Sequence, residues 1–403
     1  MRTALSILLF FPSITFGLLS AEIFPWAFLV SIVYIRTLNK NIFFILVIFI
    51  TSSLYSLYQF SFNHNQIDLI RSLATYANVL FVSQYILSLN EKQIFKLARI
   101  GKFIFFFLVF LGFLQSIGSL TIDSIIKLLI PRGSGFSLIE SARGVTLLST
   151  EPARAGIELT LIYCIYRLTL LKSSTFHIFD ILLIIFQIAV IKSTSSVFFS
   201  FIFIGLMYLS FRGLLILPLI IAMGFYFLSF FEGNRASDLV LAIAELEDLS
   251  AVTFFIVNES GNRLLGLYSF YKYGFYHPFG GGLGLWPETS MQAVIESGFD
   301  YTSIRFFDVV SDGRLSPFRG PGLISNLMLD IGIIGTSVVS LAFVKIIKPL
   351  KNFLRYEKFG HVAILIFLIK ISIFGSPGNP IPFLMLLIIL KYQYFYNLSL
   401  RKV

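Results

Sequence analysis

Residues 103–120 read FIFFFLVFLGFLQSIGSL, eighteen consecutive positions without a charged side chain. A helix needs roughly 20 apolar residues to cross the hydrocarbon core of a bilayer. About twelve comparable runs follow one another along the 403 residues, separated by short charged breaks. They lie at approximately 4–20, 22–36, 41–60, 73–90, 103–121, 155–172, 177–192, 195–211, 213–231, 321–344, 360–376 and 380–398.

The composition of the chain supports the same class of protein. Hydrophobic residues make up 57% of the sequence and charged residues 13%, and the mean hydropathy is +0.86. These values lie outside the range of soluble domains. We therefore expect an all-α, multi-pass integral membrane protein with about 12 transmembrane helices in a single polytopic domain over residues 1–403.

The net charge of +10 has a topological pattern rather than the pattern of a nucleic-acid-binding surface. The basic residues gather in alternate breaks between the apolar runs, and such loops face the cytoplasm. Both termini are then cytoplasmic, and the loops at 61–72, 121–154 and 232–320 are external. No nucleic-acid partner is expected. The basic breaks contain Arg36, Lys40, Lys92, Lys96, Arg99, Lys102, Arg167, Lys172, Arg212, Lys345, Lys348, Lys351, Arg355, Lys358, Arg401 and Lys402.

The two longer external loops are the expected functional segments. Loop 232–320 carries eleven acidic against six basic residues, in contrast to the basic breaks. Within it, the pattern predicts a short helix from about Asn262 to Tyr276, followed by four glycines between Gly280 and Gly284. In loop 121–154, apolar residues at helical spacing between Ile122 and Leu129 predict a short surface helix.

Histidine and cysteine patterns give no indication of a metal site. The single cysteine, Cys164, lies within an apolar run, and the four histidines are far apart in the sequence. Zinc sites need several such ligands at short spacings. We therefore expect neither a metal nor another cofactor.

Four motifs fall on the predicted external side or within reach of it. They read RGVTLLSTEPARAG at 143–156, KSTSS at 192–196, GNRLLGLYSFYKYGFYHPFGGGLG at 261–284 and GPGLISNLMLDIGIIG at 320–335. In this order, the motifs resemble those of the O-antigen polymerase and O-antigen ligase family. Its members have an arginine followed by an EP segment, a serine-rich turn, an arginine-led helix ending near glycines, and a glycine-bearing helix entry. The resemblance covers residues 143–335.

This resemblance implies a metal-independent glycosyltransferase in the bacterial inner membrane. The expected substrate is an undecaprenyl-diphosphate-linked oligosaccharide, which is joined at the periplasmic face with lipid diphosphate as the leaving group. The lipid bilayer, an upstream flippase and a chain-length regulator are the other implied partners. Because diphosphate develops negative charge as it leaves, arginine side chains that bind it would stabilise the transition state.

Arg143 and Arg263 match motif positions and are the arginines expected to act in catalysis. Arg263 also precedes Gly274 by eleven residues, as in the R-x10-G pattern of such polymerases. An external arginine can instead be solvated or contact a lipid headgroup. The residues expected to bind substrate are Arg154, Ser195, His277, Arg305, Arg314 and Arg319.

The general base has several candidates. Glu151 of the EP segment is the first, although a glutamate at a helix start can instead simply favour the helix dipole. Asp308, Asp312 and His277 are the alternatives.

Two other functions compete with the polymerase. Ligases of the family carry a histidine followed by Asn, Ser or Gln about eleven residues before the glycine-bearing helix entry, and this chain has Pro321 and Gly322 in those places. A polysaccharide flippase or another transporter would need charged residues inside its helices, and the main ones visible in the sequence are Lys370 and Asp330.

Overall fold

Every regular element that the structure describes is helical. The computed structural model describes residues 6–14, 24, 29, 32–33, 38–59, 66–118, 120–130, 144–170, 177–208, 245, 248, 252, 255, 262–351 and 358–400. The helices are α3 (Lys40–Gln59), α4 (Gln66–Ser88), α5 (Glu91–Ser116), α6 (Leu120–Leu129), α8 (Pro152–Arg167), α9 (Ile178–Phe186), the π-helical η1 (Gln187–Ile191), α10 (Thr194–Tyr208), α14 (Asn262–Tyr276), α15 (Trp286–Ser297), the 3-10 turn η3 (Tyr301–Ser303), α16 (Arg305–Ser311), α17 (Leu323–Lys351), α18 (Lys358–Ile373) and α19 (Ile381–Leu400).

Four of these helices are long and apolar enough to cross a membrane, as expected of a multi-pass membrane protein. They cover Lys40–Tyr58, Glu91–Ser116, Leu323–Leu350 and Ile381–Ser399, and two shorter apolar helices cover Ile178–Ile191 and Thr194–Tyr208. The all-helical class is thus confirmed. The number of twelve spans stays a prediction, because the run at 213–231 lies wholly, the run at 22–36 largely and the run at 4–20 partly outside the described residues.

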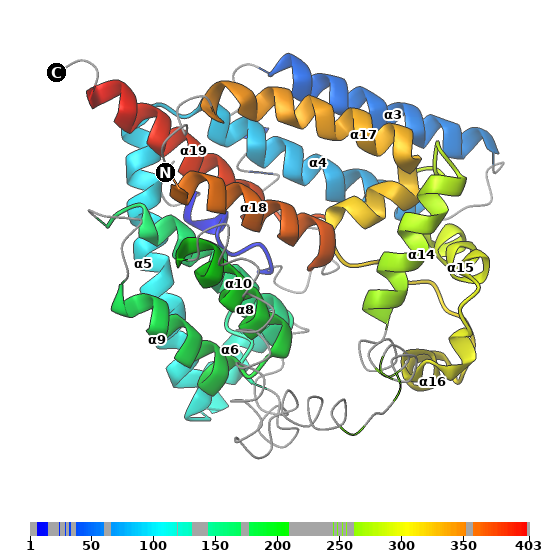
Figure 1. Cartoon of the computed structure of the whole chain (residues 1–403), viewed down its shortest axis with the longest axis horizontal. Coiled ribbons are helices and arrows are strands. Elements are labelled where there is room, and N and C mark those ends of the chain that lie inside the picture. Colours follow the sequence, from blue (N-terminus) through cyan, green and yellow to red (C-terminus); the bar gives the residue numbers. More distant parts are fainter. Residues whose placement is uncertain are drawn as a thin grey trace.

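The helices form one body in which α19 is central and α3 is peripheral. The first ten residues of α19 are all buried, and this helix packs on α4, α5, α8 and α18. On α3, Phe43 and Phe44 are exposed while Ile42 and Ile45 are buried. Large apolar side chains on an outward face are expected to contact lipid rather than water. Figure 1 shows α3 lying along α17, with α14 and α15 beside α17 and α16 further below.

The predicted helix from Asn262 to Tyr276 is confirmed as α14, with the same bounds. The short helix expected near residues 122–129 is confirmed as α6.

Helix α17 is broken where its backbone passes Gly332. This residue has φ +65° and ψ −174°, a conformation available essentially to glycine alone. The break frees the backbone groups of the preceding turn, which cannot find water inside a membrane protein. They need partners from another part of the chain.

The glycine-rich loop at 277–284 supplies those partners. The N–H groups of Gly281 and Gly282 donate to the carbonyls of Leu329 and Asp330 at 2.9 Å each, and Ile334 N–H donates to Pro278 O at 3.1 Å. The approach is so close that a Cβ on Gly280 would lie 2.5 Å from the nitrogen of Gly332. The glycines are therefore required by backbone packing, and the loop and the broken helix form one unit.

The end of the body opposite the Gly332 break also buries charged side chains. Arg167, which the charge pattern assigns to a cytoplasmic break, is buried beside Asp180, with 0% and 1% side-chain exposure. Tyr163 donates to the same carboxylate at 2.6 Å. Asp180 on α9 supplies a buried counter-charge. The cytoplasmic side expected for this break stays a prediction.

Lys391 on α19 is also buried at this end. Its ammonium donates to the carbonyls of Ile86, at 3.3 Å, and Leu87, at 2.8 Å, and also to that of Leu89. These carbonyls belong to the last turn of α4 and the residue after it, which have no helical partners of their own. The sequence pattern identified Lys370 and Asp330 as the main charged residues inside the helices. The structure adds four buried ones: Glu158, Arg167, Asp180 and Lys391.

Gly332→Ala should destabilise the protein strongly, because the new Cβ would lie 2.2 Å from the carbonyl oxygen of Pro278. Gly298→Ala is the matched control, since Gly298 also has a positive φ, +78°, but nothing lies within 4 Å of its Cβ position. Thermal unfolding of both variants in detergent checks this. The control should lose only the strain of its backbone, about 1–3 kcal/mol. An equal loss in both variants would contradict the close packing of the break.

Candidate functional site

The four sequence motifs meet at one end of the helical body. Val145 N–H donates to Val190 O at 3.2 Å, which joins the first motif to the end of η1, just before the second motif. A Cβ on Gly156 would lie 2.4 Å from that of Ser196, so α8 and α10 touch where both helices begin. The third and fourth motifs are joined by the contacts of the glycine-rich loop with α17. Segments far apart in the chain are thus brought into contact in pairs.

An exposed ion pair joins the first motif to the third. Arg263 Nη2 lies 3.1 Å from Glu151 Oε2, and the two side chains are 47% and 44% exposed. Glu151 occupies the N-cap position of α8, but its side chain makes no capping hydrogen bond. Its carboxylate is directed to Arg263, 112 residues further along the chain. The structure therefore brings together two of the three residues expected in catalysis.

The third of these residues, Arg143, lies outside the described residues. Its neighbour Gly144 is described, and a Cβ there would lie 1.8 Å from the carbonyl oxygen of Ile191 and 2.9 Å from Cβ of Lys192. The backbone next to Arg143 therefore packs on the turn that carries the second motif. In that turn Lys192 has φ +51°, and Ser195 lies partly buried in the first turn of α10.

A charged group of side chains extends inward from the ion pair. Arg154 lies one turn along α8 from Glu151, and Glu158 follows after another turn, with only 6% exposure. Asn379, just before α19, donates its amide to Glu158 Oε1 at 2.7 Å. Lys370, in the last turn of α18, is 2% exposed and interacts electrostatically with Glu158, Arg154 and Glu151. Three elements thus contribute polar or charged groups to one buried centre.

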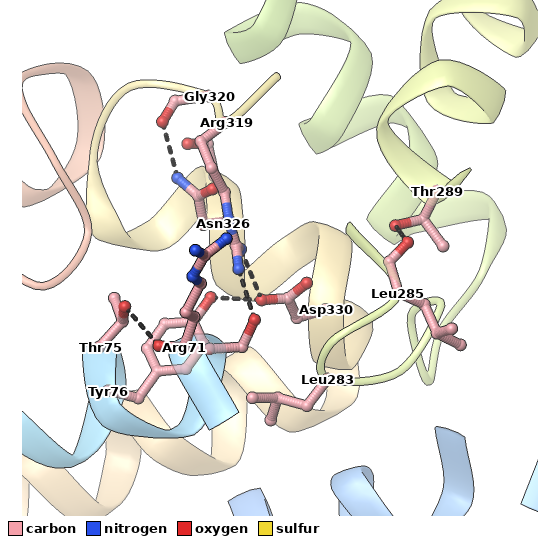
Figure 2. Close-up of polar contacts among 12 residues, drawn as sticks. Arg71, Thr75, Tyr76, Leu283, Leu285, Thr289, Arg319, Gly320, Asn326 and Asp330 are labelled. Atoms are coloured by element: carbon pink, nitrogen blue, oxygen red, sulfur yellow. Dashed lines mark hydrogen bonds and ion pairs between the residues drawn. The ribbon is translucent and has the colours of Figure 1, made fainter. Parts of the chain in front are cut away.

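Arg319, expected to bind substrate, is held by partners within the protein. Figure 2 shows it reaching from the segment before α17 to Asp330, whose carboxylate also accepts from Tyr76. Arg319 Nη1 lies 3.1 Å from Asp330 Oδ2 with 8% and 0% side-chain exposure, and Nη2 donates to Ser72 at 2.6 Å. The guanidinium also stacks on Trp286 at 4.8 Å. These contacts fasten α17 to α4, and the proposed contact with substrate stays a prediction.

His277 lies at the end of α14, away from the Glu151–Arg263 pair. Its Nε2 is 2.9 Å from Glu296 Oε2, and its ring stacks on Tyr273 with centroids 4.1 Å apart. Burial, assisted by the Glu296 carboxylate, raises the pKa of Tyr273 to about 12, so this hydroxyl is protonated at neutral pH. These contacts give His277 a place in the packing of α14 on α15. The structure does not bring His277 to the ion pair.

The remaining candidates belong to the segment around α16. Arg305 begins that helix, Asp308 lies exposed within it, and Asp312 follows it with φ +50°. Arg314 is exposed in the next stretch. The described part of the chain shows no hydrogen bond or ion pair from Asp308, Asp312 or Arg314 to the Glu151–Arg263 pair. The roles expected for all four residues stay predictions.

Sequence reasoning missed Glu158 and Asn379 and identified Lys370 only as an intramembrane charge. A signal was present, because Glu158 follows Arg154 by four residues and so shares its helix face. Both Glu158 and Lys370 interrupt apolar runs, and ionisable residues in such positions commonly mark functional sites. Within the described residues, no group of three or more His, Cys, Asp or Glu side chains could hold a metal ion.

Comparisons with known proteins add no assignment. No protein-family model, no curated protein and no solved structure matches the chain. Function must therefore be inferred from the residues themselves and from their arrangement.

Cysteines placed at both ends of the ion pair should be cross-linked by a short bifunctional thiol reagent. The variant combines Glu151→Cys and Arg263→Cys with Cys164→Ala, which removes the buried native thiol. Both positions are more than 40% exposed, so the reagent can reach them. Mass spectrometry of linked peptides provides the readout. The control pairs Glu151→Cys with Lys348→Cys, an exposed position near the far end of α17. Linkage in the control alone, or in neither variant, would contradict the site.

Proposed function

We propose that the protein is a glycosyltransferase of the O-antigen polymerase type. It joins undecaprenyl-diphosphate-linked oligosaccharide repeats at the periplasmic face of the bacterial inner membrane. The observation that carries this proposal is the exposed Glu151–Arg263 pair, which unites the first and third motifs at the end where α8 begins. An acid and an arginine at one accessible place supply a proton acceptor and a diphosphate ligand.

The exposure of the pair suits exchange with a substrate. An exposed ion pair contributes about 0–1 kcal/mol, so Arg263 can leave Glu151 at little cost. Diphosphate offers several charged oxygens to the planar guanidinium, and such bidentate contacts are the stronger ones. The Arg319–Asp330 pair is buried by contrast, and separating such a pair costs about 3–5 kcal/mol. Of the two arginines, Arg263 is the one available to a ligand.

A single event then binds the donor and frees the base. When Arg263 moves to the donor diphosphate, the Glu151 carboxylate loses its partner and can accept a hydrogen bond from the acceptor's hydroxyl. That hydroxyl oxygen forms a bond to the anomeric carbon of the donor, and its proton goes to Glu151. The bond between the anomeric carbon and phosphate oxygen breaks, and lipid diphosphate leaves with the electron pair. Arg263 stabilises the charge that develops on it.

The entry to α17 favours polymerase over ligase. Gly322 occupies one of the two places where ligases of the family carry polar side chains, and it has φ +80°. A Cβ there would lie 2.7 Å from Ile371 O, and Gly322 N–H donates to Gly375 O at 2.7 Å. No larger side chain fits at position 322. The polar side chain that a ligase carries in this place is therefore absent.

A transporter is the second candidate, since buried charges and a broken helix are typical of transporters. In those proteins the freed backbone groups line the binding site. Here the break at Gly332 is filled by the loop at 277–284, whose N–H groups bind the freed carbonyls. This packing favours a structural role for the break, and the enzyme remains the better interpretation.

The membrane arrangement belongs to the same proposal. About twelve spans place both termini in the cytoplasm and loops 121–154 and 232–320 in the periplasm. An upstream flippase delivers the repeats, and a chain-length regulator is the further partner.

Arg263→Ala should abolish long polysaccharide in cells, while the amount of protein stays normal. Arg263→Lys should also be impaired, because lysine keeps the charge but lacks the fork that binds two phosphate oxygens. Gel analysis of the polysaccharide and immunoblotting of the membrane fraction measure these two quantities. Lys348→Ala, an exposed basic residue at the other end of α17, is the control and should give normal polymer. Normal long chains from the alanine variant at position 263 would refute the proposed role.

A further inference from the structure

The inner charged group beside the ion pair has an unbalanced charge. Arg154 and Lys370 are basic side chains, and Glu158 is the buried acid that interacts with both. Glu151, the other acid that interacts with Lys370, is engaged by Arg263. This group, made of Arg154, Glu158 and Lys370, therefore holds one more positive than negative charge. A buried excess charge is costly unless an anion compensates it.

Several hydrogen-bond donors of the two basic side chains in this group have no partner among the described residues. The Nε and Nη1 atoms of Arg154 are buried and have no hydrogen-bond partner among the described residues. The Lys370 ammonium has three hydrogens and donates to a single described acceptor, Phe374 O, at 2.7 Å. Buried polar groups in native proteins normally have partners, and a bound ion is one explanation of an exception. The unused donors here all belong to cations.

Glu158, the acid of the group, has a neutral hydrogen-bond partner. Asn379 donates to Glu158 Oε1 at 2.7 Å, so part of this carboxylate's capacity is used by a neutral partner. Glu158 interacts electrostatically with both cations, and the donors of Arg154 and Lys370 named above stay unused. Such a set of cationic donors with few acceptors suits a phosphate group.

We propose that Arg154 and Lys370 bind a phosphate group, with Glu158 as the positioning residue that keeps them together. The site lies one helical turn inside the Glu151–Arg263 pair. A phosphate in this position would be the inner half of a diphosphate whose outer half meets Arg263. That the phosphate belongs to a lipid diphosphate rests on the proposed function; binding of the phosphate itself does not.

Titration of the full-length protein in nanodiscs with inorganic diphosphate, followed by calorimetry, tests the site. Lys370→Met and Arg154→Gln should each weaken binding about tenfold or more, the effect of losing one charged hydrogen bond. Glu158→Gln should tighten binding, because it removes the opposing charge while keeping the shape. A purely structural role of the three residues would not produce opposite signs.

A double variant guards against misfolding. Lys370→Met alone leaves Glu158 with one counter-charge fewer, whereas Lys370→Met with Glu158→Gln removes one charge of each sign. The double variant should therefore be as stable as the wild type to heat and still bind diphosphate weakly. Lys348→Met is the control for charge alone and should bind normally. Wild-type affinity in the double variant, or weaker binding in Glu158→Gln, would overturn the proposal.

Undecaprenyl diphosphate in the nanodisc distinguishes the two sources of phosphate. Competition by the lipid against inorganic diphosphate indicates a lipid headgroup, whereas binding of the inorganic ion alone limits the site to free phosphate and contradicts its extension to the lipid. Charge-dependent binding without any glycan polymerisation would leave this site in place and remove the polymerase. Polymerisation that is unaffected by Lys370→Met would leave the polymerase in place and overturn the phosphate site.

Discussion

The break of α17 at Gly332 is the constraint on which the arrangement of the candidate site depends. A helix interrupted inside a membrane protein must have its freed carbonyls bound, and the N–H groups of Gly281 and Gly282 bind two of them. This requirement holds the loop at 277–284 against α17, and with it the C-terminal end of α14. At the other end of α14 lies Arg263. The position of the arginine that meets Glu151 is therefore a consequence of backbone hydrogen bonding some distance away.

Burial separates the charged pairs into two groups with different uses. The Arg319–Asp330 and Arg167–Asp180 pairs are almost fully buried. The first joins α17 to the segment before it, and the second joins α8 to α9. Breaking either would leave an uncompensated charge inside the protein, so these pairs serve the fold. The Glu151–Arg263 pair is nearly half exposed and can be opened at small cost. A buried arginine such as Arg319 thus stabilises the fold, whereas the exposed Arg263 is a candidate to bind substrate.

The sequence predicted local features well and long-range relations poorly. Apolar runs and turn residues predicted the all-helical class and the bounds of α14, because both depend on neighbours in the chain. The contact of Glu151 with Arg263 spans 112 residues, and no spacing rule could have placed it; the family resemblance alone suggested that their motifs belong together. The order of the motifs likewise could not show that Arg319 is held by Asp330, or that His277 faces Glu296.

Buried charges were the main failure of sequence reasoning, and the reason is physical. Positive residues at the ends of apolar runs usually face the cytoplasm, but this rule does not predict burial, and the counter-charge of Arg167, Asp180, comes from the following helix. Glu158 and Lys370 interrupt apolar runs without any local indication of their partners. Only the packing of α8 against α19 and α10 against α18 brings these residues and Asn379 together.

An assay of the purified protein with lipid-linked repeats tests the proposed polymerase most directly. The protein is reconstituted in liposomes containing undecaprenyl-diphosphate-linked oligosaccharide, without lipid A core and with excess EDTA. A metal-independent polymerase should produce longer glycans on the lipid and release undecaprenyl diphosphate in proportion to the linkages formed. Glycan transfer that occurs only after lipid A core is added would identify a ligase. Activity that requires a divalent ion, or no glycosyl transfer at all, would contradict the proposed mechanism.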